Sequence, residues 1–286
     1  MQSLLLEHRD DIYGAVFYGS LALFAIAEFL LPFLAQRHAV GRRWLTNFTL
    51  GIGNMLLTGL IMPIGAVALA LLVAEKGWGL FHVLNLPGWL SVPLGILLLD
   101  FAKYAEHVLM HRLPLLWRAH VVHHADLDID FTTGLRHHPL EALVGAVTLP
   151  LVIVLFGAPA LSVVAFQVLA TAAALYTHAN IRFHPALDRI LRPILVTRDA
   201  HLVHHSAAVV ETDSNYGLIF LIWDRLFGTY RAEAKGGPEG MTIGLDYFRE
   251  PRELVIDRAL TMPFRVPRSA PAPSPRERTR TVQPPA

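Results

Sequence analysis

Long apolar stretches constrain the fold of this chain more than any other feature. Crossing the ~30 Å hydrocarbon layer of a bilayer takes about 20 helical residues. Apolar runs of suitable length or nearly so cover residues 13–34 and 48–73, a run that begins near Trp89, and residues 140–156 and 159–177. In lipid the backbone must satisfy its own hydrogen bonds, so such runs form helices. The sequence therefore predicts an all-α polytopic membrane protein with about four or five transmembrane helices.

The overall composition agrees with a membrane location. Hydrophobic residues make up 53% of the 286 residues, charged residues 16%, and the mean hydropathy is +0.44. No basic start with a short apolar run and a cleavage site precedes the first apolar run, so we expect this run to remain as an anchor. The formal net charge of +1 gives no electrostatic basis for a nucleic-acid partner. The absence of cysteine excludes disulfides, thiolate metal sites and cysteine nucleophiles.

Basic residues in the short loops predict the orientation. The loop after the first run carries Arg37, Arg42 and Arg43, whereas residues 75–87 carry only Lys76. Loops rich in lysine and arginine stay in the cytoplasm. Counting forward from a cytoplasmic first loop places every histidine group at or beyond the cytoplasmic membrane face. We therefore expect a cytoplasmic, histidine-rich helical cap on the membrane helices.

Histidines gather in one part of the chain, with twelve of the fifteen between His107 and His205. Two H-x-x-H-H patterns, which begin at His120 and His201, lie about eighty residues apart. Residues at i, i+3 and i+4 share a helix face. Each triplet can offer its first imidazole with one neighbour to one metal, while the third, turned by roughly 100°, reaches a second metal. The spacing predicts one pocket with two metal ions.

A structural role is the alternative for each histidine taken singly. If all of them were structural, about ten rings would lie in an apolar chain without charge partners, and each unpaired polar group would cost roughly 1 to 3 kcal/mol. Imidazole-only sites suit zinc, copper, iron and nickel. One closed structural zinc site needs only about four ligands. Two open redox metals therefore fit the number of histidines better.

One helix stripe leads from the third apolar run to the histidines. Asp100, Tyr104, His107 and His111 fall at i, i+4, i+7 and i+11. An ionisable residue in the hydrocarbon region is costly and indicates function by default. We predict catalytic roles for Asp100 and Tyr104, with Asp100 supporting a metal-bound histidine, and a local pair between Asp100 and Lys103 is the alternative.

The histidine motifs resemble, in order, those of the integral-membrane fatty acid hydroxylase and sterol desaturase superfamily. DFAKYAEHVLMH is similar to the first histidine box, HVVHH to the second and HLVHH to the third, with RHHPLE and THAN between them. The stretches ETDSNYG and WDRLFGTY follow the last box, so the resemblance covers roughly residues 100–230. The short boxes and compact loops are similar to bacterial members called sterol desaturases, a name that does not fix the substrate. The resemblance to bacterial members implies a location in a bacterial inner membrane.

The resemblance implies a non-haem di-iron centre that uses O2 to remove a hydrogen from a lipid C–H bond, ending in hydroxylation or desaturation. The implied iron ligands are His107, His111, His120, His123, His124, His138, His178, His201, His204 and His205. His138 is preferred to His137 because the histidine directly before proline is the one that recurs in the family. His184 ranks low as well, since it occupies a position that is expected to be apolar.

Metal-bound histidines donate their other ring N–H to a carboxylate, a carbonyl or water. The candidate carboxylates are Asp100, Glu106, Glu141, Asp199 and Glu211. Asn180 and Asn215 could serve too, but helix-cap or turn roles suit them better. Glu28, midway through the first apolar run, has no evident partner and stays unassigned.

The lipid substrate is expected to enter from the bilayer, because a closed apolar pocket protects a reactive oxidant from water. Candidate lining residues, each equally consistent with ordinary helix packing, are Leu97, Leu143, Val147, Phe166 and Leu169. Trp223 and Phe227 are predicted to anchor at the lipid interface. Asp224 is expected to pair with Arg225 or to cap the fold.

Electrons must come from a separate partner, since the chain has no haem-binding domain, flavin fingerprint or G-x-G-x-x-G turn. A reductase, a ferredoxin or a cytochrome is implied. Its predicted docking surface is the basic face formed by Arg182, Arg189, Arg192 and Arg198. Anionic lipid headgroups are the alternative partner of these arginines.

The predicted organisation has four parts. Residues 1–88 form N-terminal transmembrane helices and loops, residues 89–232 the hydroxylase-like catalytic domain, residues 233–262 a cytoplasmic segment, and residues 263–286 a disordered tail rich in proline and arginine. Two other functions stay open. One is a hydrolase that uses zinc-bound water, although HExxH is absent. The other is a non-enzymatic metal or haem carrier.

Overall fold

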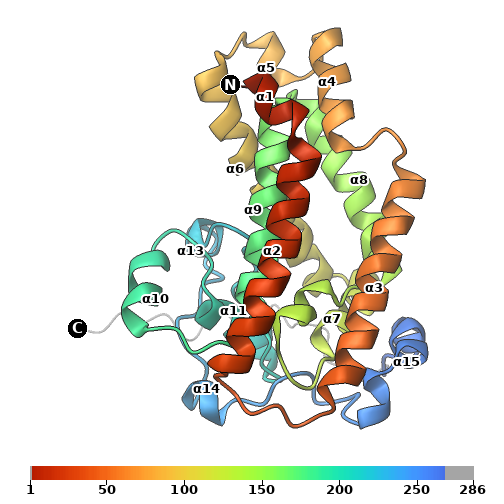
Figure 1. Ribbon diagram of the computed structural model, residues 1–286, viewed down its shortest axis with the longest axis vertical. Helices are drawn as coiled ribbons and strands as arrows, with labels where there is room; N and C mark the ends of the chain where they lie inside the picture. Colours follow the sequence, from red (N-terminus) through yellow and green to blue (C-terminus); the bar gives the residue numbers. More distant parts are fainter. Residues whose placement is uncertain (1, 268–286) are drawn as a thin grey trace.

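The computed structural model describes residues 2–267, and its regular structure is helical (Figure 1). Five long helices run along the molecule: α2 (Arg9–Leu30), α3 (Val40–Ile61), α6 (Gly88–Arg112), α8 (Pro139–Phe156) and α9 (Ala160–His178). Across residues 2–267 the extended pairings are limited to isolated bridges. The predicted all-α fold is confirmed.

Within residues 2–267, four stretches are long and apolar enough to cross a membrane, namely Arg9–Leu30, Val40–Val83, Pro139–Phe156 and Ala160–His178. They agree with the predicted apolar runs. The third predicted run becomes α6, which has 25 residues but carries Asp100, Lys103 and Glu106 in its second half. α6 therefore lies among the apolar helices while it presents polar groups toward one end.

The second apolar run is broken into two helices rather than one. α3 ends at Ile61, and α4 (Ala66–Lys76) begins after Gly65, whose φ of +70° suits glycine. Pro63 lies in the break, where a proline cannot continue a helix. A short helix, α5 (Leu80–Val83), follows at the same end of the molecule as α4 (Figure 1). There Gly79 comes so close to Gly157 that a Cβ on Gly79 would lie 2.1 Å from the Gly157 nitrogen, so only glycine lets these two loops meet.

The main apolar core lies among α4, α6, α8 and α9. It contains Leu99, Ile153, Val163 and Phe166, all buried. Ile219 belongs to the same cluster, although it follows the last histidine box by fourteen residues, from 205 to 219. A segment beyond the histidines therefore returns to the membrane helices.

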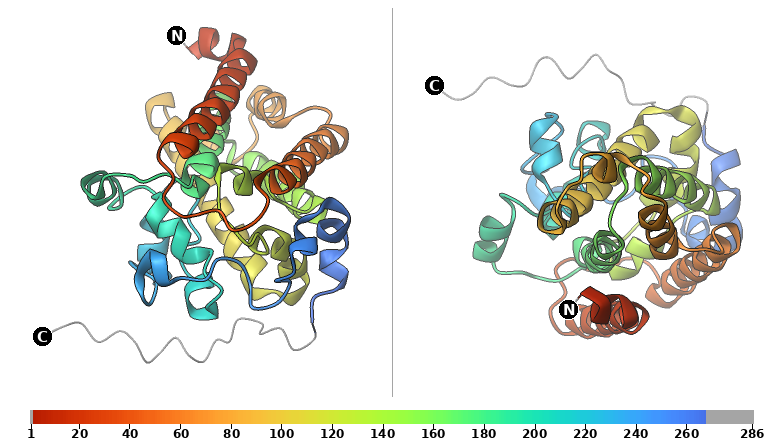
Figure 2. Two further views of the ribbon diagram at one scale, coloured as in Figure 1. Left: turned by 60° about the horizontal axis from the view of Figure 1, so that its bottom comes forward. Right: turned by 90° about the horizontal axis from the view of Figure 1, so that it is seen from above.

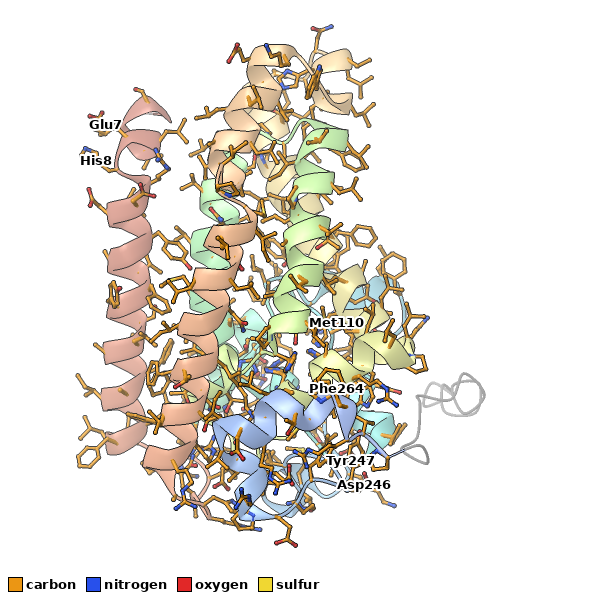
Figure 3. All side chains as sticks on the ribbon, turned by 90° about the vertical axis from the view of Figure 1, so that its right-hand side faces the viewer. Glu7, His8, Met110, Asp246, Tyr247 and Phe264 are labelled. Atoms are coloured by element: carbon orange, nitrogen blue, oxygen red, sulfur yellow. The ribbon has the colours of Figure 1, made fainter. Side chains whose placement is uncertain are left out.

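Short elements form a cap at the end opposite α1 (Gln2–Glu7), α4 and α5 (Figures 1 and 2). They are α7 (Pro114–His124), η1 (Phe131–Leu135), α11 (Arg198–His204), α12 (Val209–Thr212), α14 (Gly237–Gly240), η2 (Pro251–Leu254), α15 (Ile256–Thr261) and η3 (Met262–Phe264). Two more short helices, α10 (Pro185–Leu191) and α13 (Ile222–Leu226), lie beside the bundle, farther from this end (Figure 1). In Figure 3, Met110 near the end of α6 and Phe264 of the cap both lie far from Glu7 and His8, which mark the opposite end of the molecule. Trp117, Val121 and Met262 belong to a second apolar core, which holds the cap together.

The start of the predicted tail belongs to this cap. Arg265 forms an ion pair with Glu253, and its guanidinium lies 5.1 Å from the ring centre of Phe248. Val266 packs against the second core. Packed structure therefore continues past residue 263, and the rest of the predicted disordered tail, residues 268–286, lies outside the described residues.

A buried ionic network ties α3 to the loop after the second histidine box. Arg43 is fully buried and bonds to the carboxylates of Asp126 at 2.7 Å and Asp130 at 2.6 Å. Burial raises the pKa of Asp126, but the opposite effect of Arg43 and Thr133 is larger, so the pKa is lowered to about 2. Arg43 is thus a structural cation, and the exposed positive charge around the start of α3 comes from Arg37, before the helix, and Arg42, in its first turn.

Glu28 has a clear structural role. Its carboxylate accepts hydrogen bonds from the backbone N–H groups of Phe131 at 2.7 Å and Asn180 at 2.8 Å. Asn180 in turn exchanges two hydrogen bonds with the backbone of Leu34. Glu28 therefore joins α2 to the loops that follow α7 and α9.

Candidate metal centre

The first histidine group is built from three helices. His107 and His111 come from α6, His120 and His124 from α7, and His204 from α11. The Nε2 atom of His107 lies 3.0 Å from those of His120 and His204. His124 Nε2 lies 3.1 Å from His120 Nε2. Five imidazoles far apart in sequence thus converge on one point.

The second group contains four buried histidines. His123 comes from α7, His178 from the end of α9, and His201 and His205 from α11 and its C-terminal cap. The Nε2 atom of His178 lies 3.1 or 3.2 Å from the Nε2 atoms of the other three. Both H-x-x-H-H triplets are divided, because each sends its i and i+4 rings to one group and its middle ring to the other.

The donor spacing of both groups fits metal ions. Nitrogen ligands lie about 2.0 to 2.1 Å from zinc, and at bond angles of about 90 to 109° they are then roughly 2.9 to 3.4 Å apart. The observed Nε2 separations of 3.0 to 3.2 Å fall in this range. His111 Nε2 is buried without a hydrogen-bond partner, which is costly unless a metal binds it.

The protonation state of the rings also suits ligation. Burial is the main cause that lowers the pKa of His204 to about 3, and nearby His120 and His178 contribute. Burial and neighbouring histidines hold the pKa values of His124 and His205 well below the usual range. Neutral imidazole is the form that binds metals, so the groups could each hold a metal ion.

Backbone carbonyls orient three of these rings. The Nδ1–H groups of His107, His204 and His178 donate to the carbonyls of Tyr216 at 2.8 Å, Ser214 at 2.7 Å and Ala174 at 2.6 Å, respectively. A donating Nδ1 leaves the Nε2 lone pair free for a metal. The segment ETDSNYG thus supplies two of these carbonyls, a role that side-chain motifs do not reveal.

Two carboxylates support further rings. His120 Nδ1 lies 3.1 Å from Glu141 Oε1, and His111 Nδ1 lies 3.3 Å from Asp213 Oδ1. Glu141 was among the carboxylates proposed from the sequence, but Asp213 was not. Its place eight residues after His205, in a stretch already singled out by resemblance, is the signal that could have identified it.

The other proposed carboxylates bond elsewhere. Glu106 bonds to Lys103 and Thr148, and Asp199 pairs with Arg198 at 2.9 Å. The Glu211 carboxylate accepts from the Ser206 hydroxyl and the Lys235 N–H. Asn215 joins Ala200 to Arg231 through backbone hydrogen bonds. These side chains hold the protein around the histidine groups.

Asp100 and Tyr104 lie one layer behind the histidines. The Asp100 carboxylate accepts hydrogen bonds from Ile219, Phe220 and Trp223. The Tyr104 hydroxyl lies 3.0 Å from the Thr229 hydroxyl, and its ring meets Tyr216 edge-on. Tyr216 in turn contacts the rings of His107, His111 and His204.

The structure places His138 outside both groups. Its Nδ1 accepts the N–H of Leu140 at the start of α8, and its Nε2–H donates to the Leu260 carbonyl at 3.1 Å. His137 instead lies 2.9 Å from Glu141 and stacks on His123 at 4.5 Å, and with His120 and Glu141 it forms a third possible metal-binding set. His184 caps α10 by accepting the Ala186 N–H. Nine of the ten proposed ligands thus lie in the two groups.

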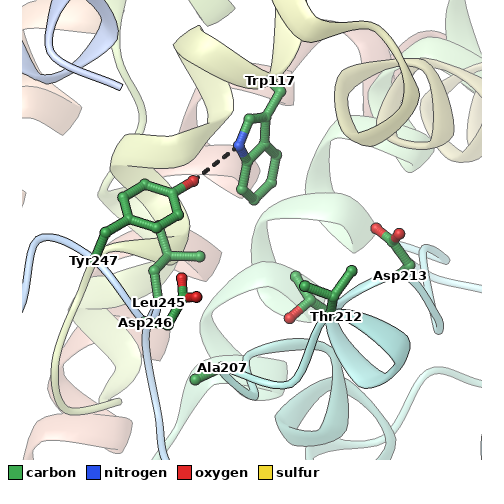
Figure 4. A pocket seen from close by; sticks show the side chains of 8 residues that line it. Trp117, Ala207, Thr212, Asp213, Leu245, Asp246 and Tyr247 are labelled. Atoms are coloured by element: carbon green, nitrogen blue, oxygen red, sulfur yellow. Dashed lines mark hydrogen bonds between the residues drawn. The ribbon is translucent and has the colours of Figure 1, made fainter. Parts of the chain in front are cut away.

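A small cavity lies beside the first group on the cap side (Figure 4). Its volume is about 20 Å³, and its walls include Trp117, Thr212, Asp213, Leu245 and Tyr247. This is enough room for about one water molecule. The Trp117 indole N–H donates to the Tyr247 hydroxyl at 3.0 Å, and the Trp117 ring lies 5.0 Å from that of His111.

Comparison with known proteins places this site in a family. Residues 92–229 match the family model described as fatty acid hydroxylase. Alkylglycerol monooxygenase of Danio rerio is 32% identical over 179 residues, which cover 60% of this chain and 38% of that protein. The human alkylglycerol monooxygenase is 29% identical over 183 residues, with the same shares. Ornithine lipid hydroxylase OlsE of Rhizobium tropici is 26% identical over 242 residues, covering 82% of this chain and 70% of that protein.

The chain spans only 38 to 40% of the length of the vertebrate alkylglycerol monooxygenases that it matches. No solved structure matches it. The fold and the site define a helical membrane protein with two histidine groups that could hold metal ions. All nine histidines of these groups fall inside the matched domain. The domain of residues 92–229 therefore belongs to the fatty acid hydroxylase family, as the histidine boxes indicated.

Proposed function

We propose that this protein is a membrane-bound oxidoreductase that hydroxylates a lipid, with two iron ions held by the histidine groups. The observation that carries the proposal is the convergence of nine histidines in two sets at the end of the apolar helices. When bound, the two irons would supply the redox chemistry that lets O2 attack an unactivated C–H bond. Hydroxylation consumes one O2, two electrons and two protons and yields an alcohol and water. Desaturation of the same substrate class is the other outcome that the family resemblance allows.

The ligand set that we propose has nine members. It contains His107, His111, His120, His124 and His204 in one group, and His123, His178, His201 and His205 in the other. His138 is left out because it lies outside both groups, with its Nδ1 accepting the Leu140 N–H and its Nε2–H donating to the Leu260 carbonyl. His137 shares Glu141 with His120, so we assign it to positioning that carboxylate.

The surroundings of the site protect it from water. His111, His120, His123 and His124 are at most 2% exposed. A buried site suppresses side reactions of a strong oxidant. Trp117 and Tyr247 close the cap side beside His111. The Tyr104 ring contacts Tyr216, whose ring contacts three histidines of the first group, so the role we propose for Tyr104 is to position this group.

The substrate is expected to approach through the bilayer. Four of the residues named as channel lining, Leu97, Leu143, Val147 and Leu169, are exposed on helix surfaces, and Phe166 is buried in the main core. The exposed side chains suit contact with lipid tails. Relatives that act, by name, on alkylglycerols and ornithine lipids favour a substrate with a polar head and a long alkyl chain.

We also propose that the cap and the metal centre face the cytoplasm, in a bacterial inner membrane. Exposed Arg37 and Arg42 next to the cap support this orientation. Electrons would come from a separate reductase, ferredoxin or cytochrome that docks on the cap. Among the four arginines proposed as its docking surface, Arg198 is buried, Arg192 pairs with Asp188, and Arg182 and Arg189 are exposed.

Elemental analysis of the protein from iron-sufficient cells, with Mössbauer spectra, tests the proposal. We expect about two irons per chain. His204→Ala and His123→Ala should each lower the iron content, one for each group, while His184→Ala serves as the control with full iron. Lipid extracts from cells with and without the protein should differ in one hydroxylated or desaturated species. Zinc as the only metal, with no activity after anaerobic iron loading, would favour a hydrolase or a metal carrier instead.

A further inference from the structure

The segment after the last histidine box turns back toward the membrane helices. Ile219 belongs to the same buried cluster as Leu99 of α6 and Phe166 of α9. Leu195 and Phe220 pack against this cluster and pair with each other in an antiparallel bridge. Figure 1 shows α13 farther from the cap end than α11. The chain therefore packs against the sides of the apolar helices here and then returns to the cap, without crossing the membrane domain.

The register of α6 fixes the depth of this segment. The carboxylate of Asp100 accepts the backbone N–H groups of Ile219 at 3.0 Å and Phe220 at 3.2 Å, and the indole N–H of Trp223 at 2.8 Å. Asp100 precedes His107 by seven residues on the same helix, which is about 10 Å at 1.5 Å per residue. The segment is thus held about 10 Å farther into the membrane domain than the start of the first histidine group.

The backbone of this segment is satisfied by buried protein groups. Asp224 accepts the N–H groups of Tyr216 and Gly217, both at 2.8 Å. The N–H of Leu221 donates to the Ile194 carbonyl at 2.8 Å. Non-helical backbone survives at membrane depth only where the protein supplies its hydrogen-bond partners. The buried carboxylates of Asp100 and Asp224 therefore accept backbone hydrogen bonds that water would accept in a surface loop.

The outer face of the segment is apolar. Five large side chains are 50 to 72% exposed: Ile190, Ile194, Ile222, Leu226 and Phe227. Figure 2 shows the neighbouring α10 standing out from the side of the helix bundle. Arg189 is exposed nearby, and the Arg225 guanidinium lies over the Tyr230 ring and donates to the Arg192 carbonyl. Arginine beside apolar and aromatic side chains is typical of the membrane interface, where the charged head reaches the lipid headgroups.

We propose that residues 185–196 and 218–227, here called the re-entrant lobe, insert into the membrane leaflet on the histidine side and bind lipid acyl chains. Its apolar face continues the lipid-facing surface of the long helices, and its arginines lie at the level of the headgroups. Asp100 makes the insertion possible by satisfying the backbone at that depth. This surface is independent of the proposed reaction, because it follows from packing and not from the metal.

Fluorescence quenching tests the depth of the re-entrant lobe. The chain has no cysteine, so Leu226→Cys and Ile222→Cys can each carry one bimane label in the full-length protein in phospholipid nanodiscs. Quenching by lipids with brominated acyl chains is compared with quenching by aqueous iodide. Leu151→Cys, on the exposed face of α8, is the lipid reference, and Val210→Cys, exposed on α12 of the cap, is the aqueous reference.

We expect both lobe labels to behave like the Leu151 label, with strong bromolipid quenching and little iodide quenching. Iodide quenching equal to that of the Val210 label would overturn the proposal, because the lobe would then lie in water. Protection from both quenchers would overturn it as well, because it would show that another protein surface covers the lobe. The unchanged helical circular-dichroism signal of each variant shows that it folds.

Discussion

At the scale of single residues, ring orientation decides which histidines can bind metal. His107, His178 and His204 donate from Nδ1 to backbone carbonyls, and His111 and His120 face carboxylates with the same atom. Each of these rings therefore turns Nε2 toward the metal position. His138 has the opposite arrangement, since its Nδ1 accepts a backbone N–H and its Nε2 bonds to Leu260.

A matched pair of substitutions tests this difference. His138→Ala should keep nearly full metal content, because the ring has no lone pair left for a metal. His111→Ala should lower the content of the first group clearly, because the buried His111 Nε2 is free to bind. Metal per chain, measured after gel filtration, checks both variants. Loss of metal in His138→Ala with a normal circular-dichroism spectrum would restore His138 to the ligand set.

Sequence periodicity predicts the two groups, but of the side chains and carbonyls that support the rings only Glu141 was proposed from the sequence. The i, i+3 and i+4 spacing is enough to divide each H-x-x-H-H triplet, because helix geometry alone fixes those directions. The choice between His137 and His138 depends on where α8 begins. Pro139 is the first residue of α8 and makes His138 its cap, with the ring turned onto Leu140. Asp213 and the carbonyls of Ser214 and Tyr216 depend on a loop path that no local pattern encodes.

At the scale of elements, buried charges join helices to loops. Asp100 joins α6 to the re-entrant lobe, Glu28 joins α2 to two loops, and Arg43 joins α3 to the loop after α7. A charge in an apolar helix is expensive unless it has partners. From the sequence Asp100 is a candidate functional group, Glu28 stays unassigned and Arg43 is one of the basic residues of a loop. Their partners become visible only when distant segments are packed together.

Asp100→Asn should destabilise the protein without emptying the metal site. The amide keeps one acceptor atom but places an N–H group against donors from the lobe, so we expect a loss of roughly 1 to 3 kcal/mol. Thermal unfolding in detergent, followed by circular dichroism, measures it, and metal content should stay near that of the natural protein. Asp11→Asn, at a carboxylate that is 86% exposed, is the control with a small change. Metal loss at unchanged thermal stability would instead assign Asp100 to the metal centre.

Arg43→Met should be more damaging. It removes the partner of two buried carboxylates, Asp126 and Asp130, and breaking a buried ion pair costs roughly 3 to 5 kcal/mol. Arg42→Met, the exposed neighbour, should change the free energy of unfolding by no more than about 0.5 kcal/mol. Denaturant unfolding of both variants gives the comparison. Equal stability of the two variants would mean that the network contributes nothing.

At the scale of the whole molecule, the cap depends on the chain beyond η3. Arg265 pairs with Glu253 and Val266 packs on the second core. A chain that ends after Pro267 should keep its thermal stability, whereas one that ends after Phe264 should lose roughly 1 to 2 kcal/mol of packing and pairing. Melting temperatures of the two truncated proteins measure this. Identical values would make residues 265–267 dispensable, as the composition of the tail had suggested.

The all-helical architecture could be predicted from apolar run length, because in lipid no other open structure satisfies its backbone. The break between α3 and α4 could also be seen in Pro63 and Gly65, although the hydropathy of the run hid it. The return of residues 218–227 to the main core could not, since the segment is short and follows a polar motif. Its position depends on a carboxylate 119 residues earlier, at Asp100.

The two histidine groups also constrain how the protein is made. His204 completes the first group and His201 and His205 complete the second, and all three lie on the last of the contributing helices. A ribosome must therefore translate α11 before either group is whole, by which time the chain of α2 to α9 is already available for membrane insertion. The metal that we propose would accordingly bind after these helices have been made, and hydrogen bonds to carbonyls and carboxylates would keep the rings in place until then.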